Sequence, residues 1–199
     1  MARTQSKHYP EIRQSILKSS AQLFAAKGFS TTTIVDLAEA CHSSRGALYH
    51  YFSSKEEILA TILEEHVASM LHVLMGIGEQ RLEPREHLHL FARSLMQINA
   101  EHQAEQVVLL NDWNQLDHKK QLEIGAMQRR IVAILRDILS RLDNQHRMTP
   151  RLATSSAMSL LGSLNYTYTW FNPEGPVSAE EYADHVVEIF LDGFLGKPA

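Results

Sequence analysis

The chain has a single cysteine, Cys41, among its 199 residues, so an internal disulfide is excluded. A lone thiol fits a reducing compartment, and we expect it to pack as a small apolar side chain. A redox sensor is the less favoured alternative, because nothing in the sequence obviously lowers the pKa of this thiol. No apolar run approaches the roughly 18 residues that a membrane span needs. The polar segment 1–14 lacks the apolar core of a signal peptide, so we expect a cytoplasmic protein without a membrane span.

Helix-breaking residues are also few. The chain has nine glycines and six prolines, and those that interrupt apolar patterns sit at plausible joints: Gly28, Pro84, Pro150 and 172–176. Strand-like alternation never persists, and no internal repeat is present. Apolar residues recur at helical spacing almost throughout, which predicts an all-α fold. Pro84 and Thr149-Pro150 predict helix starts, and Ser54 with Glu57 and Ser178 with Glu181 predict capping boxes.

Motifs that carry catalytic or metal chemistry are missing. The chain shows no nucleophile motif, no phosphate-binding loop and no metal-ligand spacing. His87 and His89 are two residues apart and fall on different sides of a helix, so we expect solvated histidines rather than ligands. We therefore expect no enzyme activity, no cofactor and no metal. An enzyme is the weaker alternative.

The segment 31–55 is the most informative part of the chain. It predicts two short helices joined by a tight turn, and Ser43 or Ser44 can cap the second helix. Leu48 and Phe52 lie four residues apart and are expected to face inward. Four residues then remain on the outer face, namely Arg45, Gly46, Tyr49 and His50. This set suits DNA, because glycine allows close approach, arginine reaches a phosphate or a guanine edge, and tyrosine donates to a phosphate.

The charge distribution agrees with DNA contact by one end of the chain. Residues 1–55 hold seven lysines and arginines against three acidic residues, a net charge of +4. Because the whole chain carries −4, residues 56–199 carry −8. We call residues 1–55 the head. A basic head followed by an acidic remainder of the chain favours nucleic-acid binding by the head. Ordinary surface variation is the alternative, and the charge pattern decides the matter only together with the helix pattern.

The N-terminal quarter resembles the DNA-binding domain of the TetR family of bacterial transcriptional regulators. The matching positions are Thr32, Thr33, Ile34, Leu37, Ala38, Ser44, Gly46, Leu48, Tyr49, Tyr51, Phe52 and Lys55. Two positions depart, because His42 stands where the family usually has a turn glycine and Ser43 where it usually has valine. Histidine tolerates a left-handed backbone better than most residues, so we expect the turn to form.

The resemblance implies a domain organisation and a partner. We expect a three-helix helix-turn-helix domain over 1–55 and a larger helical domain for ligand binding and dimerisation over 56–199. A homodimer formed through the last two helices would place one head on each half of a palindromic operator in double-stranded DNA. A monomer whose last helices only complete its core is the alternative. The expected DNA-binding residues are Thr32, Thr33, Ser44, Arg45, Gly46, Tyr49, His50 and Lys55. Of these, we expect Arg45 and His50 to contact base edges.

A small-molecule site would lie among the middle helices of the second domain if the resemblance holds. Large aromatic, methionine and occasional polar side chains suit an apolar pocket, although most of them would be buried in any helical domain. The expected lining residues are Phe91, Leu95, Met96, Leu110, Trp113, Met127, Ile131, Asn165, Tyr166 and Trp170.

The segment 162–175 is similar to a branch of the family that regulates fatty-acid, sterol and aromatic-acid breakdown and often responds to acyl-CoA thioesters. We expect Arg93, Arg129 or Arg130 to meet the anionic groups of such a ligand, unless they are simply solvated. The resemblance thus implies a repressor that a small apolar or acyl-CoA effector releases from DNA by a population shift. The alternative is a helical adaptor or activator of the same fold, with a protein partner or without a small-molecule inducer.

Overall fold

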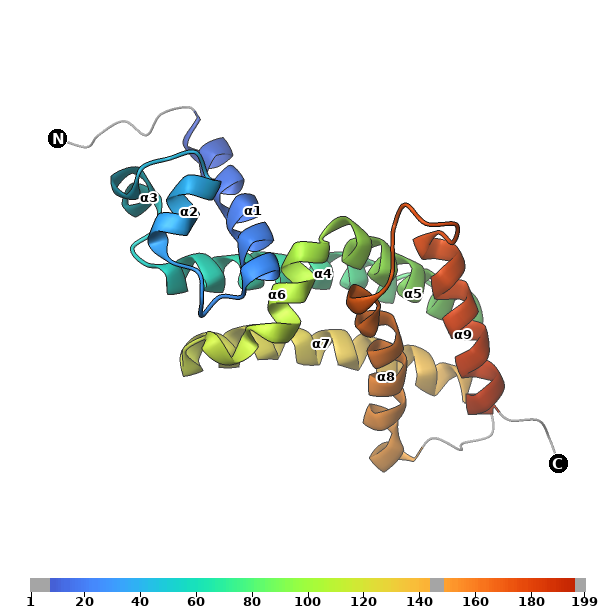
Figure 1. The fold of residues 1–199 in the computed structure, drawn as a ribbon. Coiled ribbons are helices and arrows are strands. Elements are labelled where there is room, and N and C mark those ends of the chain that lie inside the picture. The colour runs from blue at the N-terminus through green and yellow to red at the C-terminus, as the bar shows by residue number, and fades with distance from the viewer. Residues whose placement is uncertain (1–7, 144–148, 196–199) are drawn as a thin grey trace. The chain divides into compact units, whose positions relative to one another are not determined.

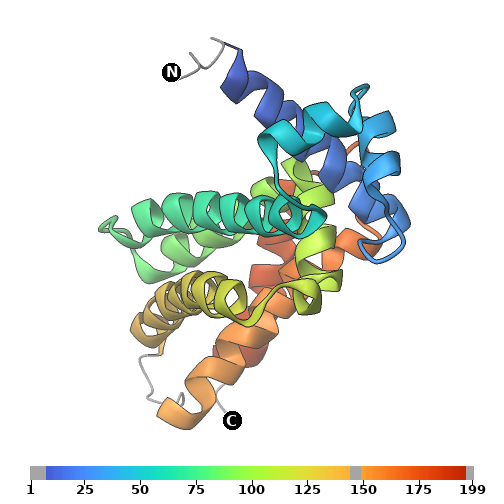
Figure 2. The ribbon, with the colours of Figure 1, turned by 90° about the vertical axis from the view of Figure 1, so that its left-hand side faces the viewer.

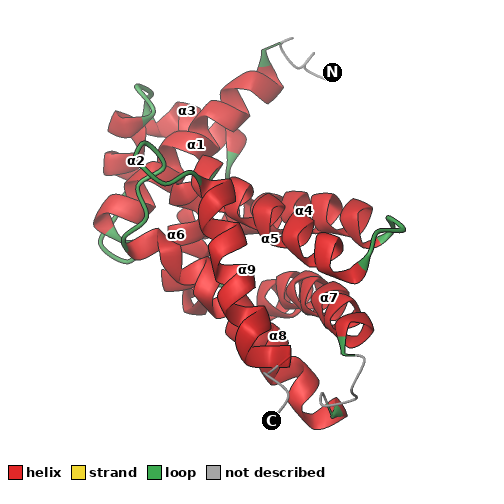
Figure 3. Cartoon of the chain, turned by 90° about the vertical axis from the view of Figure 1, so that its right-hand side faces the viewer, coloured by secondary structure: helices red, strands yellow, loops and turns green. Residues whose placement is uncertain are grey.

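The computed structural model describes residues 8–143 and 149–195, and within them the chain is helical with no strand (Figures 1 and 3). The all-α prediction is therefore confirmed. The described helices are α1 (Tyr9–Lys27), α2 (Ile34–Ala40), α3 (Arg45–Tyr51), α4 (Lys55–Gly78), α5 (Pro84–Glu101), α6 (Gln103–Asn111), α7 (His118–Leu142), α8 (Pro150–Asn165) and α9 (Ala179–Leu195), with short 3-10 helices η1 (Trp113–Gln115) and η2 (Tyr166–Thr169).

Packing divides the chain into two compact units. The first unit comprises residues 1–66 and 104–123, and the second comprises 67–103 and 124–199. Helices α4 and α7 therefore contribute residues to both units. We expected a domain boundary at residue 55 from the sequence motif. The packing units do not test this boundary, which stays a prediction.

The first unit contains α1, α2 and α3, which surround a small apolar core (Figure 1). Phe24 from α1, Leu37 from α2 and Leu48 from α3 are almost fully buried in it. The rings of Phe24 and Phe29 meet edge to face with their centroids 5.2 Å apart. Because α2 and α3 have only seven residues each, their stability comes from this shared core rather than from helix propensity.

In the second unit, α5 runs back alongside the second half of α4 (Figure 2) and packs along α9. Polar groups line the contact between α5 and α9. The guanidinium of Arg93 donates two hydrogen bonds to Asp184, at 2.6 and 2.7 Å, and also pairs with Glu180 at 2.8 Å. The two ring nitrogens of His89 lie 2.8 Å from Asp184 and 2.9 Å from Glu188. The Arg93 guanidinium is the main reason why the pKa of Asp184 lies below its usual value.

The expectation of solvated histidines was wrong at the buried His66 and at the two histidines of α5. His87 is fully buried; its Nε2 donates to the carbonyl oxygen of Ile77 at 2.7 Å, and its Nδ1 accepts from Arg141 at 2.8 Å. His89 is held by the two carboxylates of α9. Both are structural residues, because partners distant in sequence satisfy their ring nitrogens.

The helix-start predictions were largely confirmed. Pro84 and Pro150 each open a helix, although the Thr149 side chain makes no capping bond. Ser178 and Glu181 form the complete capping box. The Ser54 hydroxyl accepts from the Glu57 amide at 3.1 Å, but the Glu57 carboxylate instead accepts from the amide and hydroxyl of Ser53, each at 2.6 Å.

Within the described residues, α4 alone is long and apolar enough to cross a membrane, by length and composition. Half of its apolar window is buried inside the protein, as is usual for the core helix of a folded domain.

Candidate nucleic-acid interface and ligand pocket

The turn between α2 and α3 forms around His42. Its φ of 48° lies in the left-handed region, where the family usually has glycine. The Ser43 amide donates to the Ala38 carbonyl at 2.8 Å and closes the end of α2. The prediction that histidine supports this turn is confirmed. The turn fixes the point at which α3 begins.

Helix α3 has one buried side and one exposed side. The Ser44 hydroxyl caps it by accepting from the Ala47 amide at 3.1 Å. Leu48 and Phe52 are 2% and 3% exposed, so they anchor the helix as expected. The exposed positions include Arg45, Gly46, Tyr49 and His50, the set expected from the sequence. The space beside Gly46 is open, since an added Cβ would meet only the Ser44 hydroxyl at 4.0 Å.

An aromatic cluster supports the end of α3 and was not predicted. The Tyr9 ring stacks on the Tyr51 ring with centroids 4.7 Å apart, and it meets the His50 ring edge to face at 6.4 Å. These contacts restrict the orientation of the His50 ring, which remains exposed. Tyr9 and His50 are too far apart in sequence for any local pattern to have indicated the cluster.

Thr33 begins α2 and takes part in a capping box with Asp36. The Thr33 amide and hydroxyl both donate to the Asp36 carboxylate, at 2.7 and 2.8 Å, and the Asp36 amide donates to the Thr33 hydroxyl at 3.2 Å. Lys27 completes the cluster, with its ammonium 2.7 Å from the same carboxylate oxygen. The Lys27 bond, followed by the Thr33 bonds, lowers the pKa of Asp36 from 3.8 to about 2. We did not predict this box, although the Thr-x-x-Asp spacing could have indicated it.

Two other residues that we expected to contact DNA, Thr32 and Lys55, make hydrogen bonds within the protein. Thr32 is only 1% exposed, and its hydroxyl donates to the Gly28 carbonyl at 2.7 Å. Its side chain is therefore removed from the candidate contacts, because it stabilises the loop from inside. The Lys55 ammonium donates to the carbonyl oxygens of Phe29 and Thr32, each at 2.9 Å, and so has one N–H left for another partner.

Asp112, which follows α6, joins the same cluster in the first unit. Its carboxylate accepts a hydrogen bond from the Phe29 amide and lies near Lys55. Burial of the Asp112 carboxyl raises its pKa above the usual value despite these favourable neighbours. The loop that leads into α2 is thus tied both to α4 and to the end of α6.

The expected ligand residues are divided between the two units and differ in exposure. Leu110 and Trp113 belong to the first unit and the other eight to the second. Phe91, Leu95 and Met96 are buried, whereas Leu110, Tyr166 and Trp170 are 41%, 64% and 55% exposed. These three residues do not line the pocket described below, and their contact with a ligand stays a prediction. Tyr166 and Trp170 follow the end of α8 at Asn165, so the inward stripe of α8 is not continued.

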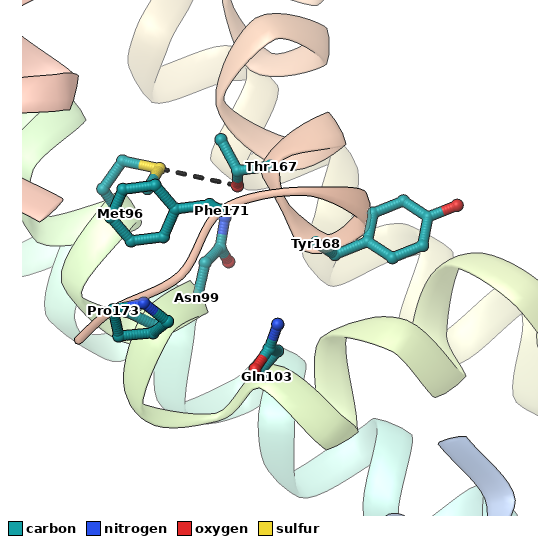
Figure 4. Close-up of a pocket in the computed structure, with 8 residues that line it drawn as sticks. Met96, Asn99, Gln103, Thr167, Tyr168, Phe171 and Pro173 are labelled. Atoms are coloured by element: carbon teal, nitrogen blue, oxygen red, sulfur yellow. Dashed lines mark hydrogen bonds between the residues drawn. The ribbon is translucent and has the colours of Figure 1, made fainter. Parts of the chain in front are cut away.

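A small pocket does open in the second unit (Figure 4). Its empty volume is about 240 Å³, much of which is open to solvent. Its lining residues are Met96, Asn99, Ala100, Gln103, Thr167, Tyr168, Phe171 and Pro173. Met96 is the one member of the expected ligand set among them. The sequence could not have shown this pocket, because it forms where the end of α5 meets η2 and the loop after it.

Two of the three arginines expected to contact an anionic ligand, Arg93 and Arg130, have partners within the protein. Arg93 is paired with Asp184 and Glu180, and the bonds to Asp184 raise the pKa of its guanidinium. Arg130 donates to the Met75 sulfur at 3.0 Å. An anion at Arg93 would therefore have to compete with two carboxylates of α9.

Two family models match successive parts of this chain. Residues 16–62 match the family model of bacterial regulatory proteins of the tetR family, and residues 81–194 match that of the tetracyclin repressor-like C-terminal domain. The transcriptional repressor KstR2 of Mycolicibacterium smegmatis is 28% identical over 190 residues, which cover 91% of this chain and 89% of that protein.

Solved structures agree with these matches. A TetR-family regulator from Bordetella parapertussis is 34% identical, with a TM-score of 0.88 over 94% of this chain and 98% of that chain. AibR, solved in complex with isovaleryl coenzyme A and operator DNA, has the same fold at 24% identity, with a TM-score of 0.78 over 89% of this chain and 97% of that chain. The chain belongs to the TetR family of bacterial transcriptional regulators.

Proposed function

We propose that the protein is a ligand-responsive repressor that binds a palindromic operator as a homodimer and is released by a small effector. The observation that carries this proposal is the exposed face of α3, where Arg45, Gly46, Tyr49 and His50 stand outward while Leu48 and Phe52 anchor the helix. A short helix with a polar outer face and an anchored inner face is suited to a major groove. The relative KstR2 is a transcriptional repressor, which supports this proposal.

Individual roles follow from which polar atoms are free. Arg45 and His50 are proposed to contact base edges, and Tyr49 to donate to a phosphate. Ser44 fits a phosphate contact, because its oxygen caps α3 while its hydroxyl proton stays available. Thr33 fits less well, since its hydroxyl proton is given to Asp36. Lys55 would reach a phosphate with its remaining N–H.

The proposed dimer uses α8 and α9, which pack against each other (Figure 3). Both helices expose large apolar side chains, which a second copy of the chain would cover in a dimer. These are Leu152 and Met158 on α8, at 52% and 51% exposure, and Ile189 on α9, at 61%. Gly162 and Gly193 have open space beside them, which allows close approach of a second helix pair. A two-fold dimer matches the two-fold symmetry of a palindromic site.

The proposed effector is a small apolar compound or an acyl-CoA thioester. The bound isovaleryl coenzyme A in AibR supports the second choice only as an analogy of fold. An operator-binding regulator acts where the DNA is, so a cytoplasmic location goes with this proposal. Effector binding would favour a conformation of the dimer whose two heads no longer fit successive major grooves.

The experiment that tests the function is selection of bound fragments from the source genome by the purified protein, with salt and competitor DNA present. The proposal expects recovery of a short palindrome whose affinity falls steeply with salt. Recovery of no preferred sequence by a folded dimer, after removal of any co-purified ligand, would contradict it. Such a result would favour an adaptor that binds a protein instead.

A further inference from the structure

A buried oxygen in the second unit lacks a hydrogen-bond partner. Asn99, on α5, is 5% exposed, and its Oδ1 receives no hydrogen bond within the described structure. Its Nδ2 donates to the Asn165 Oδ1 at 3.2 Å, which directs the oxygen away from Asn165. Folded proteins rarely leave a buried carbonyl oxygen without a donor, so each such atom calls for a specific explanation.

The unpartnered oxygen belongs to the wall of the pocket described above. In the close-up, the Asn99 carboxamide stands between Phe171 and Gln103, and its oxygen faces the space toward Gln103 and Tyr168 (Figure 4). The neighbouring hydroxyl of Thr167 does not satisfy it, because that hydroxyl donates to the Leu164 carbonyl at 2.6 Å. The pocket thus presents a buried acceptor that a bound molecule would complete.

The lining selects against charged ligands. None of its eight residues carries a charge, and Met96, Ala100, Phe171 and Pro173 are apolar. A carboxylate or phosphate would bring further acceptor atoms to the Asn99 oxygen without a cation to balance them. An ammonium group would donate to this oxygen but would find no carboxylate in the wall. A neutral group with an N–H or O–H donor on an apolar chain satisfies both conditions.

We infer that this pocket binds the neutral, hydrogen-bond-donating part of the effector, such as a secondary amide or an alcohol, with the Asn99 Oδ1 as the acceptor. The assignment to an effector rests on the proposed regulatory function, whereas the binding chemistry rests on the pocket alone. Much of the volume of about 240 Å³ is open to solvent, so the enclosed part has room for a small donor group, while the rest of the ligand would lie at the mouth of the pocket. The α5 helix ties the pocket to the contact with α9, because Asn99 and Arg93 lie on the same helix.

The test compares two probes of nearly the same shape, N-butylacetamide and butyl acetate, of which only the amide has a donor. Each is titrated into the isotopically labelled full-length protein without DNA, and dissociation constants are obtained from nuclear magnetic resonance shifts. We expect weak binding, with the amide preferred about five- to tenfold over the ester. Asn99→Leu should remove this preference, while Gln97→Leu, an amide loss at an exposed position of the same helix, should preserve it.

Equal affinity for the two probes in the natural protein, or no binding of either, would overturn the inference. A preference that survives in a folded Asn99→Leu variant would overturn it as well. If that variant does not fold, the comparison of the two probes in the natural protein still decides. Because these titrations contain no DNA, failure of operator binding cannot imitate failure of the pocket. If an operator is known and the bound amide leaves operator affinity unchanged, the assignment to an effector is wrong.

Discussion

The ammonium group of Lys55 lies 4.2 Å from the centre of the Phe29 ring and donates a hydrogen bond to the Phe29 carbonyl at 2.9 Å. A lysine that the family pattern assigns to DNA contact therefore also closes the loop before α2. Phe29 is buried, and the carbonyl oxygen of Thr32 depends on the same ammonium. The folded loop and the proposed phosphate contact thus depend on the same side chain.

Replacement of Lys55 by methionine should lower the free energy of unfolding by about 1–3 kcal/mol, because two loop carbonyls lose their donor. Urea denaturation followed by circular dichroism measures this change. Lys27→Met is the matched control: it breaks an exposed ion pair with Asp36 and should lower the free energy of unfolding less than Lys55→Met does. Equal free energies of unfolding of the natural protein and Lys55→Met would show that the two hydrogen bonds of Lys55 do not stabilise the fold.

The Asp36 carboxyl provides a pH-dependent test of the capping box. Its pKa in the folded protein is about 2, below the ordinary value of 3.8. A lowered pKa means that the carboxylate stabilises the fold above about pH 4 and that this contribution is lost as the pH falls from 4 to 2. Because the Lys27 bond is the largest cause, Lys27→Met should raise the pKa of Asp36, as measured by carboxyl carbon resonances. An unchanged pKa in this variant would assign the shift to Thr33 alone.

Arg45 should determine sequence preference if it contacts a guanine. Arg45→Ala is then expected to weaken binding to the selected operator by about 1–3 kcal/mol and to relax the preference at one base pair of each half-site. Affinities for duplexes with single substitutions measure this effect. An unchanged preference at every base pair would limit Arg45 to a phosphate contact.

Tyr49→Phe should behave differently, because a phosphate contact carries no sequence information. Loss of the hydroxyl is expected to weaken binding to the operator and to unrelated duplexes by a similar factor, about 0.5–1.5 kcal/mol. The side chain is 54% exposed, so stability should hardly change. A change confined to one sequence would instead indicate a base contact.

The dimer is tested at its apolar face. Met158→Glu and Ile189→Glu each place a charge on an exposed apolar position of α8 or α9 and should shift the protein toward monomers in sedimentation equilibrium. Val73→Glu, on α4 at 40% exposure, is the control and should leave the dimer intact. Dimers of unchanged stability in both test variants would place the interface elsewhere.

The features predicted well from the sequence depend on neighbours within a few residues. Three such features lie in α3, its caps and the turn before it. They are the buried pair Leu48 and Phe52, the Ser44 cap and the left-handed backbone at His42. Such features need only helical periodicity and the backbone preferences of single residues.

The features missed depend on partners distant in sequence. Thr32 is inside because the Gly28 carbonyl and the Lys55 ammonium meet it there, and Lys55 lies 23 positions further along the chain. The pocket joins the end of α5 to residues after α8, and the expected members Tyr166 and Trp170 are exposed because η2 replaces the helix. Apolar periodicity does not show where an α-helix changes to a 3-10 helix, because short 3-10 segments are common at the ends of α-helices.

The most direct test of the central claim is a titration of the recovered palindrome against a scrambled duplex of equal length and composition, at one physiological salt concentration. A specific reader of the proposed kind should bind the palindrome at least about 10³-fold more tightly than the scrambled duplex. Because the operator is proposed to be a two-fold site, saturation should require two or a multiple of two protomers per palindrome. Equal affinity for the two duplexes would contradict the account, whatever the strength of the binding.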